Sequence, residues 1–513
     1  MEKTTFDLGL AAYRAGNYTE AKACWQRCAE EEDHPTAMYN LGTLYESGRG
    51  VGRDEKAAFS WYERAAGAGL PAAMYRLARC FKQGYGTEKD DAAWSDWLFR
   101  AAAAGHAEAQ FEGARHLMAH DQLPRIAEEL MHQAAAQGHP GAQYEYGRIC
   151  RKRGTAEGMS EAAAWYRRAA GQGDVDSMSQ LGSMYEYGDG VPQNYEEAAR
   201  FYAMAAERGN CFAQWKTGLF LKDGRGVGKD TARAFKLLHA AAAQHSPHAR
   251  YAQHALGDAY EQGDGVAPDP AEAARWYRQA AEQGYEYAQN KLGTLYHQGK
   301  GVGQDDTAAI EWLSRAASRG LAAASFNLGI VYYEGRSVEP NDAEALRCFR
   351  KAAESGHAPA LNAIGVMYGE GRGVPKNAAE AIRYYRAAAD AGDLQATTNL
   401  AWSYFNGEGV ARDYGKAVRG FERAAQAGIH QAVLGLAVCY RLGKGVAKDK
   451  VRARELFLRA AQMGNLEAPH FLTAKGQELR PVSELDIKST AGDIAGSILE
   501  ALFNQLSEGE YDD

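Results

Sequence analysis

The sequence repeats itself at a step of 36 residues over most of its length, and this periodicity limits the folds that the chain can adopt. Twelve units begin at Ala37, Ala73, Ala109, Ala142, Ser177, Ala213, Ala252, Ala288, Ala324, Ala360, Ala396 and Ala432. The step is 36 residues except for 33 after Ala109, 35 after Ala142 and 39 after Ala213. A unit of this length cannot bury its apolar faces alone, so we expect neighbouring units to stack around a continuous core.

Glycine-rich loops recur in eight units and raise the question of a phosphate-binding site. The first reads GRGVGRD from Gly48, and similar loops begin at Gly188, Gly224, Gly263, Gly299, Gly371, Gly407 and Gly443. Each follows a helical pattern, and none continues into the G-x-x-x-x-G-K-[ST] sequence of a phosphate-binding loop. We therefore interpret the glycines as turn residues with positive φ between two helices.

The positions within a unit predict two antiparallel helices. The sixth residue is always Gly or Ala, as at Gly42 and Gly293, which predicts a close approach of the two helices. Residues such as Asp54 and Asn194 predict the start of the second helix, because their side chains accept from free backbone N–H groups. A glycine such as Gly69 then predicts its end in the left-handed conformation.

Together these residues give the pattern L-G-x-x-Y-x-x-G-x-G-V-x-x-D-x-x-x-A-x-x-W-Y-x-x-A-A-x-x-G, which resembles the Sel1-like repeat family, a relative of the tetratricopeptide repeats. The resemblance implies an all-α fold, a right-handed α-solenoid superhelix of antiparallel helix pairs whose first helices line the concave side. It also implies a protein–protein interaction scaffold. Some bacterial members are immunity or accessory proteins that bind a secreted toxic effector.

The remaining segments predict caps and a tail around the repeats. We expect residues 1–36 to form a tetratricopeptide-like capping helix pair, 37–467 the twelve repeats, and 468–479 a C-terminal capping helix. Residues 480–492 predict a linker, and 493–513 an amphipathic helix with an acidic tail. This last helix is expected either to pack on the final repeats or to dock on a partner or the groove.

Composition narrows the functional classes. The net charge of −8 disfavours nucleic-acid binding, and no apolar run is long enough to insert into a membrane. Seven irregularly spaced cysteines and an N-terminus without a secretory pattern favour a cytoplasmic protein. The oligomeric state stays open.

No catalytic, cofactor or metal site is predicted. His116 and His120 could share a helix face, but no H-E-x-x-H sequence is present, and His132 and His139 do not stand at a ligand spacing from them. Some proteins of the resembled family have carried a β-lactamase label, so a β-lactamase-like hydrolase is the alternative from another class. The S-x-x-K, S-D-N and K-T-G set that it needs is not assembled.

The first helices carry the candidate binding residues. By analogy with related helical repeats, positions 3, 4, 7, 10 and 11 of a unit should face the concave surface. In the early units these include the cationic residues Arg76, Arg79, Lys82, Arg115, Arg148, Arg151, Lys216 and Lys222. In the late units they include the apolar residues Ile330, Tyr333, Val366, Trp402, Phe405, Leu434 and Val438. On one interpretation, the cationic set is solvated surface charge and the apolar set packs between helices. On the other, the two sets line a groove that binds a partner with an acidic part and an apolar part. The acidic C-terminus could screen the basic part.

Overall fold

Helices make up nearly all the regular structure in the computed structural model, which describes residues 4–473 and 479. The predicted all-α class is confirmed, and in the described part of the chain the helices follow one another as antiparallel pairs. An isolated antiparallel bridge joins Leu472 to Leu479.

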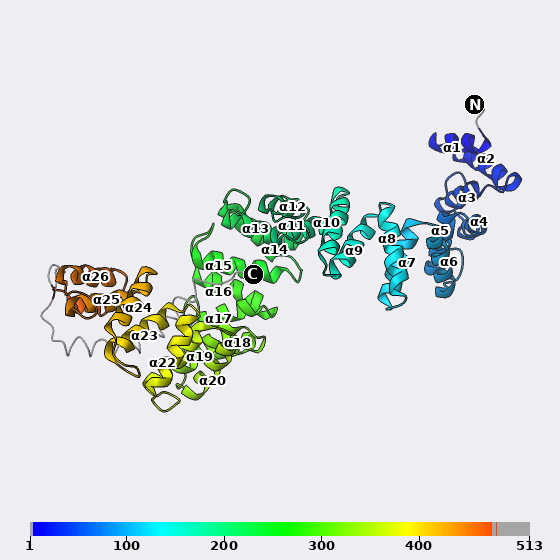
Figure 1. Ribbon diagram of the computed structural model, residues 1–513. Helices are drawn as coiled ribbons and strands as arrows, with labels where there is room; N and C mark the ends of the chain where they lie inside the picture. The colour runs from blue at the N-terminus through cyan, green and yellow to red at the C-terminus, as the bar shows by residue number, and fades with distance from the viewer. Residues whose placement is uncertain (1–3, 474–478, 480–513) are drawn as a thin grey trace. The chain divides into compact units, whose positions relative to one another are not determined.

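The chain divides into two compact units, Met1–Asp230 and Thr231–Asp513. Within each unit, every helix packs against the next one along the chain (Figure 1). The first unit contains α1 (Thr5–Arg14), α2 (Tyr18–Glu31), α3 (Pro35–Ser47), α4 (Glu55–Gly67), α5 (Pro71–Gln83), α6 (Asp91–Ala103), α7 (Ala107–Ala119), α8 (Pro124–Ala136), α9 (Pro140–Lys152), α10 (Ala156–Gly171), α11 (Val175–Tyr187), α12 (Tyr195–Glu207) and α13 (Cys211–Asp223). The second contains α14 (Thr231–Ala242), α15 (Ala249–Gln262), α16 (Pro270–Glu282), α17 (Glu286–Gln298), α18 (Asp306–Ser318), α19 (Ala322–Glu334), α20 (Asp342–Glu354), α21 (Ala358–Glu370), α22 (Ala378–Asp390), α23 (Leu394–Asn406), α24 (Tyr414–Gln426), α25 (His430–Leu442), α26 (Lys450–Gln462) and the 3-10 helix η1 (Ala468–Phe471).

The small residue at position 6 brings the two helices of a repeat together. A Cβ on Gly42 of α3 would lie 2.5 Å from the ring of Tyr62 on α4. A Cβ on Gly257 of α15 would lie 2.4 Å from the ring of Tyr277 on α16. The second helix therefore places a large ring directly on the backbone of the first, as the sequence predicts.

The glycine loops close each repeat onto the one before it. Gly299 ends α17 in the left-handed conformation, with φ of 67°. Gly301, with φ of 71°, lies so close to the first turn of α16 that a Cβ would be 2.0 Å from the carbonyl oxygen of Pro270. Protein backbone fills this space in the loop, so the loop provides no cradle for a phosphate.

The predicted helix ends are also found. Asp54 accepts from the backbone N–H of Ala57, and Asn194 accepts from those of Glu196 and Glu197. Gly69, which follows α4, has φ of 88°. These local signals fix where each helix begins and ends.

The described residues of the predicted capping helix 468–479 form a short 3-10 helix followed by an extended residue. η1 ends at Phe471, whose ring stacks on Phe457 with centroids 4.7 Å apart. Leu472 is extended, which allows it to pair with Leu479. Residues 474–478, the predicted linker 480–492 and the predicted amphipathic helix 493–513 lie outside the described residues.

Candidate functional site: a basic pocket on α7 to α11

A pocket of about 590 Å³ opens on the first helices of the repeats in the middle of the first unit. Its walls come from α7, α8, α9, α10 and α11. The lining consists of the cations Arg115, Arg148, Arg151 and Lys152, the carboxylate of Glu145, the apolar Met118, Ala119, Met131 and Ile149, and the polar Tyr166 and Gln180. We call this set the basic pocket.

The basic pocket lies where the glycine loops are missing. Most repeats join their two helices through a long loop, as at 48–54, whereas α7 joins α8 through residues 120–123 and α9 joins α10 through 153–155. Pocket residues therefore lie on the last turns of α7 and α9, beside short connections. Leu123 makes its turn without glycine, at φ of 43°.

Positive charge in the basic pocket is only partly neutralised. Arg148 pairs with Glu145 at 2.9 Å, and Arg151 contacts Gln180 at 2.6 Å and the carboxylate of Asp189 at 3.5 Å. Within the described part of the chain, neither Arg115 nor Lys152 forms an ion pair. The four cations outnumber the carboxylates of Glu145 in the lining and of Asp189 beside it, and this excess of positive charge in a recess attracts anions.

Tyr166 forms part of the wall and is fully buried, at 0% exposure. Its ring lies against the backbone of Gly147, and its hydroxyl has no hydrogen-bond partner among the described residues. Burial raises the pKa of this hydroxyl, and the nearby positive charges of Arg151 and Arg148 act in the opposite direction. Several other buried polar side-chain atoms of the described structure share this lack of a partner within the chain, among them the Tyr85 hydroxyl and the Trp94 indole nitrogen.

Three of the eight predicted cations meet in the basic pocket: Arg115, Arg148 and Arg151. Two others are used inside the fold, because Arg76 pairs with Glu46 at 2.7 Å and the buried Lys216 pairs with Glu186 at 3.1 Å. Lys82 lies over the ring of Trp94, 4.5 Å from its centroid. Arg79 and Lys222 also lie outside the pocket lining.

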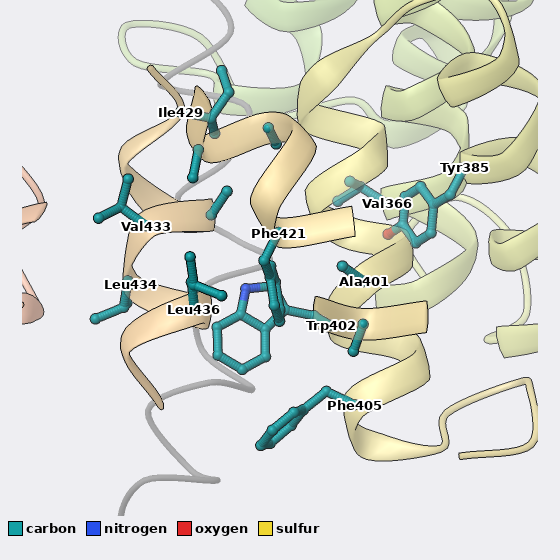
Figure 2. Packing of buried hydrophobic residues seen from close by; sticks show 14 of the residues in the cluster. Val366, Tyr385, Ala401, Trp402, Phe405, Phe421, Ile429, Val433, Leu434 and Leu436 are labelled. Carbon is teal, nitrogen blue, oxygen red and sulfur yellow. The ribbon is translucent and has the colours of Figure 1, made fainter. Parts of the chain in front are cut away.

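The structure places the predicted apolar groove residues in the core of the second unit. Ile330, Tyr333, Val366, Trp402, Phe405, Leu434 and Val438 are between 0% and 7% exposed and belong to one hydrophobic cluster. Figure 2 shows Trp402 between Phe405 and Phe421, with ring centroids 5.5 Å and 4.9 Å from its own. These residues pack between helices as part of the core, and they form no exposed apolar surface.

The predicted set did not include four residues that matter at the pocket. Lys152 stands at position 11 and Glu145 and Gln180 at position 4, so the rule for the concave face already covered them. Tyr166 lies on a second helix, which that rule omits. Comparing the residues at equivalent positions in different repeats would have drawn attention to it.

The histidines give no metal centre in the described part of the chain, where no group of three or more His, Cys, Asp or Glu residues could hold an ion. The ring of His116 lies instead against Trp94 and His120, with centroids 5.0 Å and 4.7 Å away. No helix among the described residues is long and apolar enough to cross a membrane.

Solved structures that are similar to this chain include bacterial repeat proteins. The c5321 protein, a protective antigen of uropathogenic Escherichia coli with an SLR fold, is 26% identical with a TM-score of 0.56, over 94% of this chain and 96% of that one. A Sel1 repeat protein of Oxalobacter formigenes is 29% identical over 59% of this chain and 88% of its own, with a TM-score of 0.47. The immunity protein Pa5087 of Pseudomonas aeruginosa is 21% identical over 42% of this chain and 81% of its own, with a TM-score of 0.29. No curated protein sequence matches the chain.

A profile of the Sel1 repeat matches twelve consecutive segments: 35–70, 71–106, 100–139, 140–174, 175–210, 211–246, 250–285, 286–321, 322–357, 358–393, 394–429 and 430–465. These segments cover most of the chain and reproduce the twelve units found in its sequence. The described helices pair within the segments in the same way. The chain therefore belongs to the Sel1 repeat family.

Proposed function

We propose that this chain is a non-enzymatic scaffold that binds an acidic segment of a partner protein in the basic pocket. Sel1 repeat proteins are generally interaction scaffolds and usually non-catalytic, which supports the general class. The observation that carries the specific proposal is the recess of about 590 Å³ with four cations, of which Arg115 and Lys152 have no ion-pair partner in the described structure. Arginine pairs well with carboxylates because its planar fork donates two parallel hydrogen bonds.

Exposed apolar side chains beside the pocket suit a partner that also carries an apolar residue. Met118 lines the pocket and is 40% exposed, and Leu123 and Ile126 at the α7–α8 connection are 59% and 46% exposed. A partner that covers these side chains removes apolar surface from water, which favours binding. The acidic part of the partner would bind in the basic pocket, and its apolar part would cover the exposed side chains at the α7–α8 connection.

The test is differential capture from a lysate of the native host with the full chain as bait. The variant Arg115→Gln/Arg148→Gln removes two pocket charges, and Arg27→Gln/Arg200→Gln removes two exposed charges elsewhere. We expect a protein that the natural chain and the control capture but the pocket variant loses. Equal capture of every protein by both variants would refute the proposal.

Two narrower alternatives make different predictions. An immunity or accessory protein would protect cells from one secreted effector, so the captured partner would be a toxin whose activity the chain suppresses. A β-lactamase-like hydrolase would turn over nitrocefin in the absence of any partner. Either result would replace the scaffold proposal with that alternative.

A further inference from the structure

A carboxylate, a tyrosine hydroxyl and a cation form the same cluster in three repeats, and the tyrosine is buried in each. The carboxylate stands at position 10 of a repeat, the tyrosine on its second helix, and the cation at position 4 of the next repeat. The three clusters are Glu46 with Tyr62 at 2.5 Å and Arg76 at 2.7 Å, Glu186 with Tyr202 at 2.7 Å and Lys216 at 3.1 Å, and Glu261 with Tyr277 at 2.8 Å and Lys291 at 3.3 Å. Tyr62 and Tyr202 donate to the position-10 carboxylate of their own repeat. The hydroxyl of Tyr277 lies 2.8 Å from Glu261 and 2.6 Å from Asp258 of the same repeat, so its one proton serves one of these two carboxylates.

The repeat formed by α9 and α10 keeps the tyrosine but lacks the carboxylate. Its position 10 holds Arg151, and position 4 of the following repeat holds Gln180. The hydroxyl of Tyr166 consequently has no acceptor within the described structure, although the residue is fully buried and lines the basic pocket. At the position where the sister repeats carry a glutamate, this repeat carries the cation Arg151. Arg151 and Tyr166 both line the basic pocket, which has room for a ligand.

We propose that a side-chain carboxylate of the partner, from Glu or Asp, binds between Tyr166, Arg148 and Arg151 and replaces the carboxylate that this repeat lacks. This inference rests on the proposed function and specifies the chemistry of the bound group. The ligand oxygen accepts from the Tyr166 hydroxyl, and the guanidinium N–H groups donate to the carboxylate. The sister repeats favour a carboxylate over a phosphate, because their tyrosines donate to side-chain carboxylates.

The existing contacts of Arg151 leave room for this ligand. Its guanidinium contacts Gln180 and lies 3.5 Å from the Asp189 carboxylate. The side chains of Arg151 and Asp189 are each about one-third exposed. An arginine carries five N–H donors, so these contacts do not exhaust it. Among the described residues, Arg148 pairs with Glu145 on its own helix, and its side chain is 58% exposed.

The first experiment measures binding of a fluorescein-labelled hexaglutamate peptide, acetylated and amidated, to the full chain by fluorescence anisotropy. Tyr166→Phe should weaken binding about tenfold, since it removes a hydrogen bond to a charged group. Tyr202→Phe is the matched control, because that hydroxyl already donates to Glu186, and it should leave binding unchanged. Equal affinity of the natural chain and Tyr166→Phe would overturn the proposal.

Stability distinguishes a binding role of Tyr166 from a structural one. Removing a hydroxyl that has no partner should leave the midpoint of urea unfolding unchanged or raise it. The variant Arg151→Glu/Gln180→Lys rebuilds the sister cluster inside the chain, so it should fold but bind the peptide at least tenfold more weakly. Undiminished peptide binding by this folded variant would overturn the carboxylate site.

Two further probes distinguish a side-chain carboxylate from a terminal carboxylate and from a phosphate. Hexaglutamine with a free C-terminus tests a terminal carboxylate, and tripolyphosphate tests a phosphate. Binding of either probe that is stronger than hexaglutamate and sensitive to Tyr166→Phe would overturn the side-chain assignment. Differential capture by the Arg115→Gln/Arg148→Gln variant would still support the proposed function in that case, so the two failures are distinguishable.

Discussion

Gly301 lies against Pro270 so closely that a Cβ on the glycine would be 2.0 Å from the proline carbonyl oxygen. The same relationship links Gly86 to Glu55, Gly190 to Met159, Gly226 to Tyr195, Gly265 to Thr231 and Gly409 to Ala378. In each case the second glycine of a loop covers the first turn of the preceding second helix. The glycine loops therefore act as joints between repeats.

Gly301→Ala should destabilise the second unit strongly, because the new Cβ meets backbone and the residue has φ of 71°. The left-handed conformation alone costs about 1–2 kcal/mol for a residue with a Cβ. Gly303→Ala is the control, since a Cβ there meets nothing within 4 Å. Circular dichroism during urea unfolding should show a lower midpoint for Gly301→Ala only. Equal midpoints would show that the loop is not a tight joint.

Gly293→Val should also destabilise the fold, through the contact between the helices of one repeat. A Cβ at this position would lie 2.7 Å from the Leu313 side chain on α18. We expect a loss of about 1–3 kcal/mol from overpacking. Leu313→Ala makes space, so in the double variant the two losses should sum to less than their separate values. Strict additivity, measured by chemical denaturation, would argue against the contact.

His357 predicts a dependence of stability on pH. Burial lowers the pKa of its imidazole from 6.5 to about 4. The unfolded chain therefore takes up a proton below pH 6.5 that the folded chain accepts only near pH 4. Between these values the fold loses up to about 1.4 kcal/mol per pH unit as the pH falls, and it keeps the full contribution above pH 6.5.

The variant His357→Gln isolates this contribution from those of other groups. The free energy of unfolding of the natural chain, minus that of the variant, should decrease between pH 7 and pH 5. Urea titrations at three pH values within this range give the difference directly. A difference that stays constant over the range would contradict the assignment.

The sequence predicts most of the fold because local rules determine each repeat. Asp54 caps a helix, Gly69 ends one and Gly42 admits a tyrosine ring, and each of these depends on residues close in the same repeat. The burial of Trp402 and Val366 could not be predicted in this way. It depends on how closely successive first helices approach, as where Asn399 donates to Asn362 at 2.9 Å. The separation of successive first helices is set by packing between repeats, which the residues of a single repeat do not determine.

The candidate site was partly predictable. Position within the repeat selected Arg115, Arg148 and Arg151, which line one pocket because equivalent positions of stacked helices are neighbours. It could not show that Arg76 is already paired with Glu46, since that pairing depends on the residue at another position of the previous repeat. The sequence also could not show that the Tyr166 hydroxyl lacks the glutamate acceptor that Tyr62 and Tyr202 have in their repeats.

Zero-length crosslinking tests most directly whether the basic pocket binds acidic partner segments. A carbodiimide joins a carboxylate of the bound hexaglutamate peptide to a lysine amine in contact with it, and mass spectrometry identifies the lysine. Lys152 lines the pocket, whereas Lys56 and Lys89 are exposed outside it. The account predicts that adducts concentrate on Lys152 and disappear in Arg115→Gln/Arg148→Gln. Adducts spread evenly over the three lysines would contradict it.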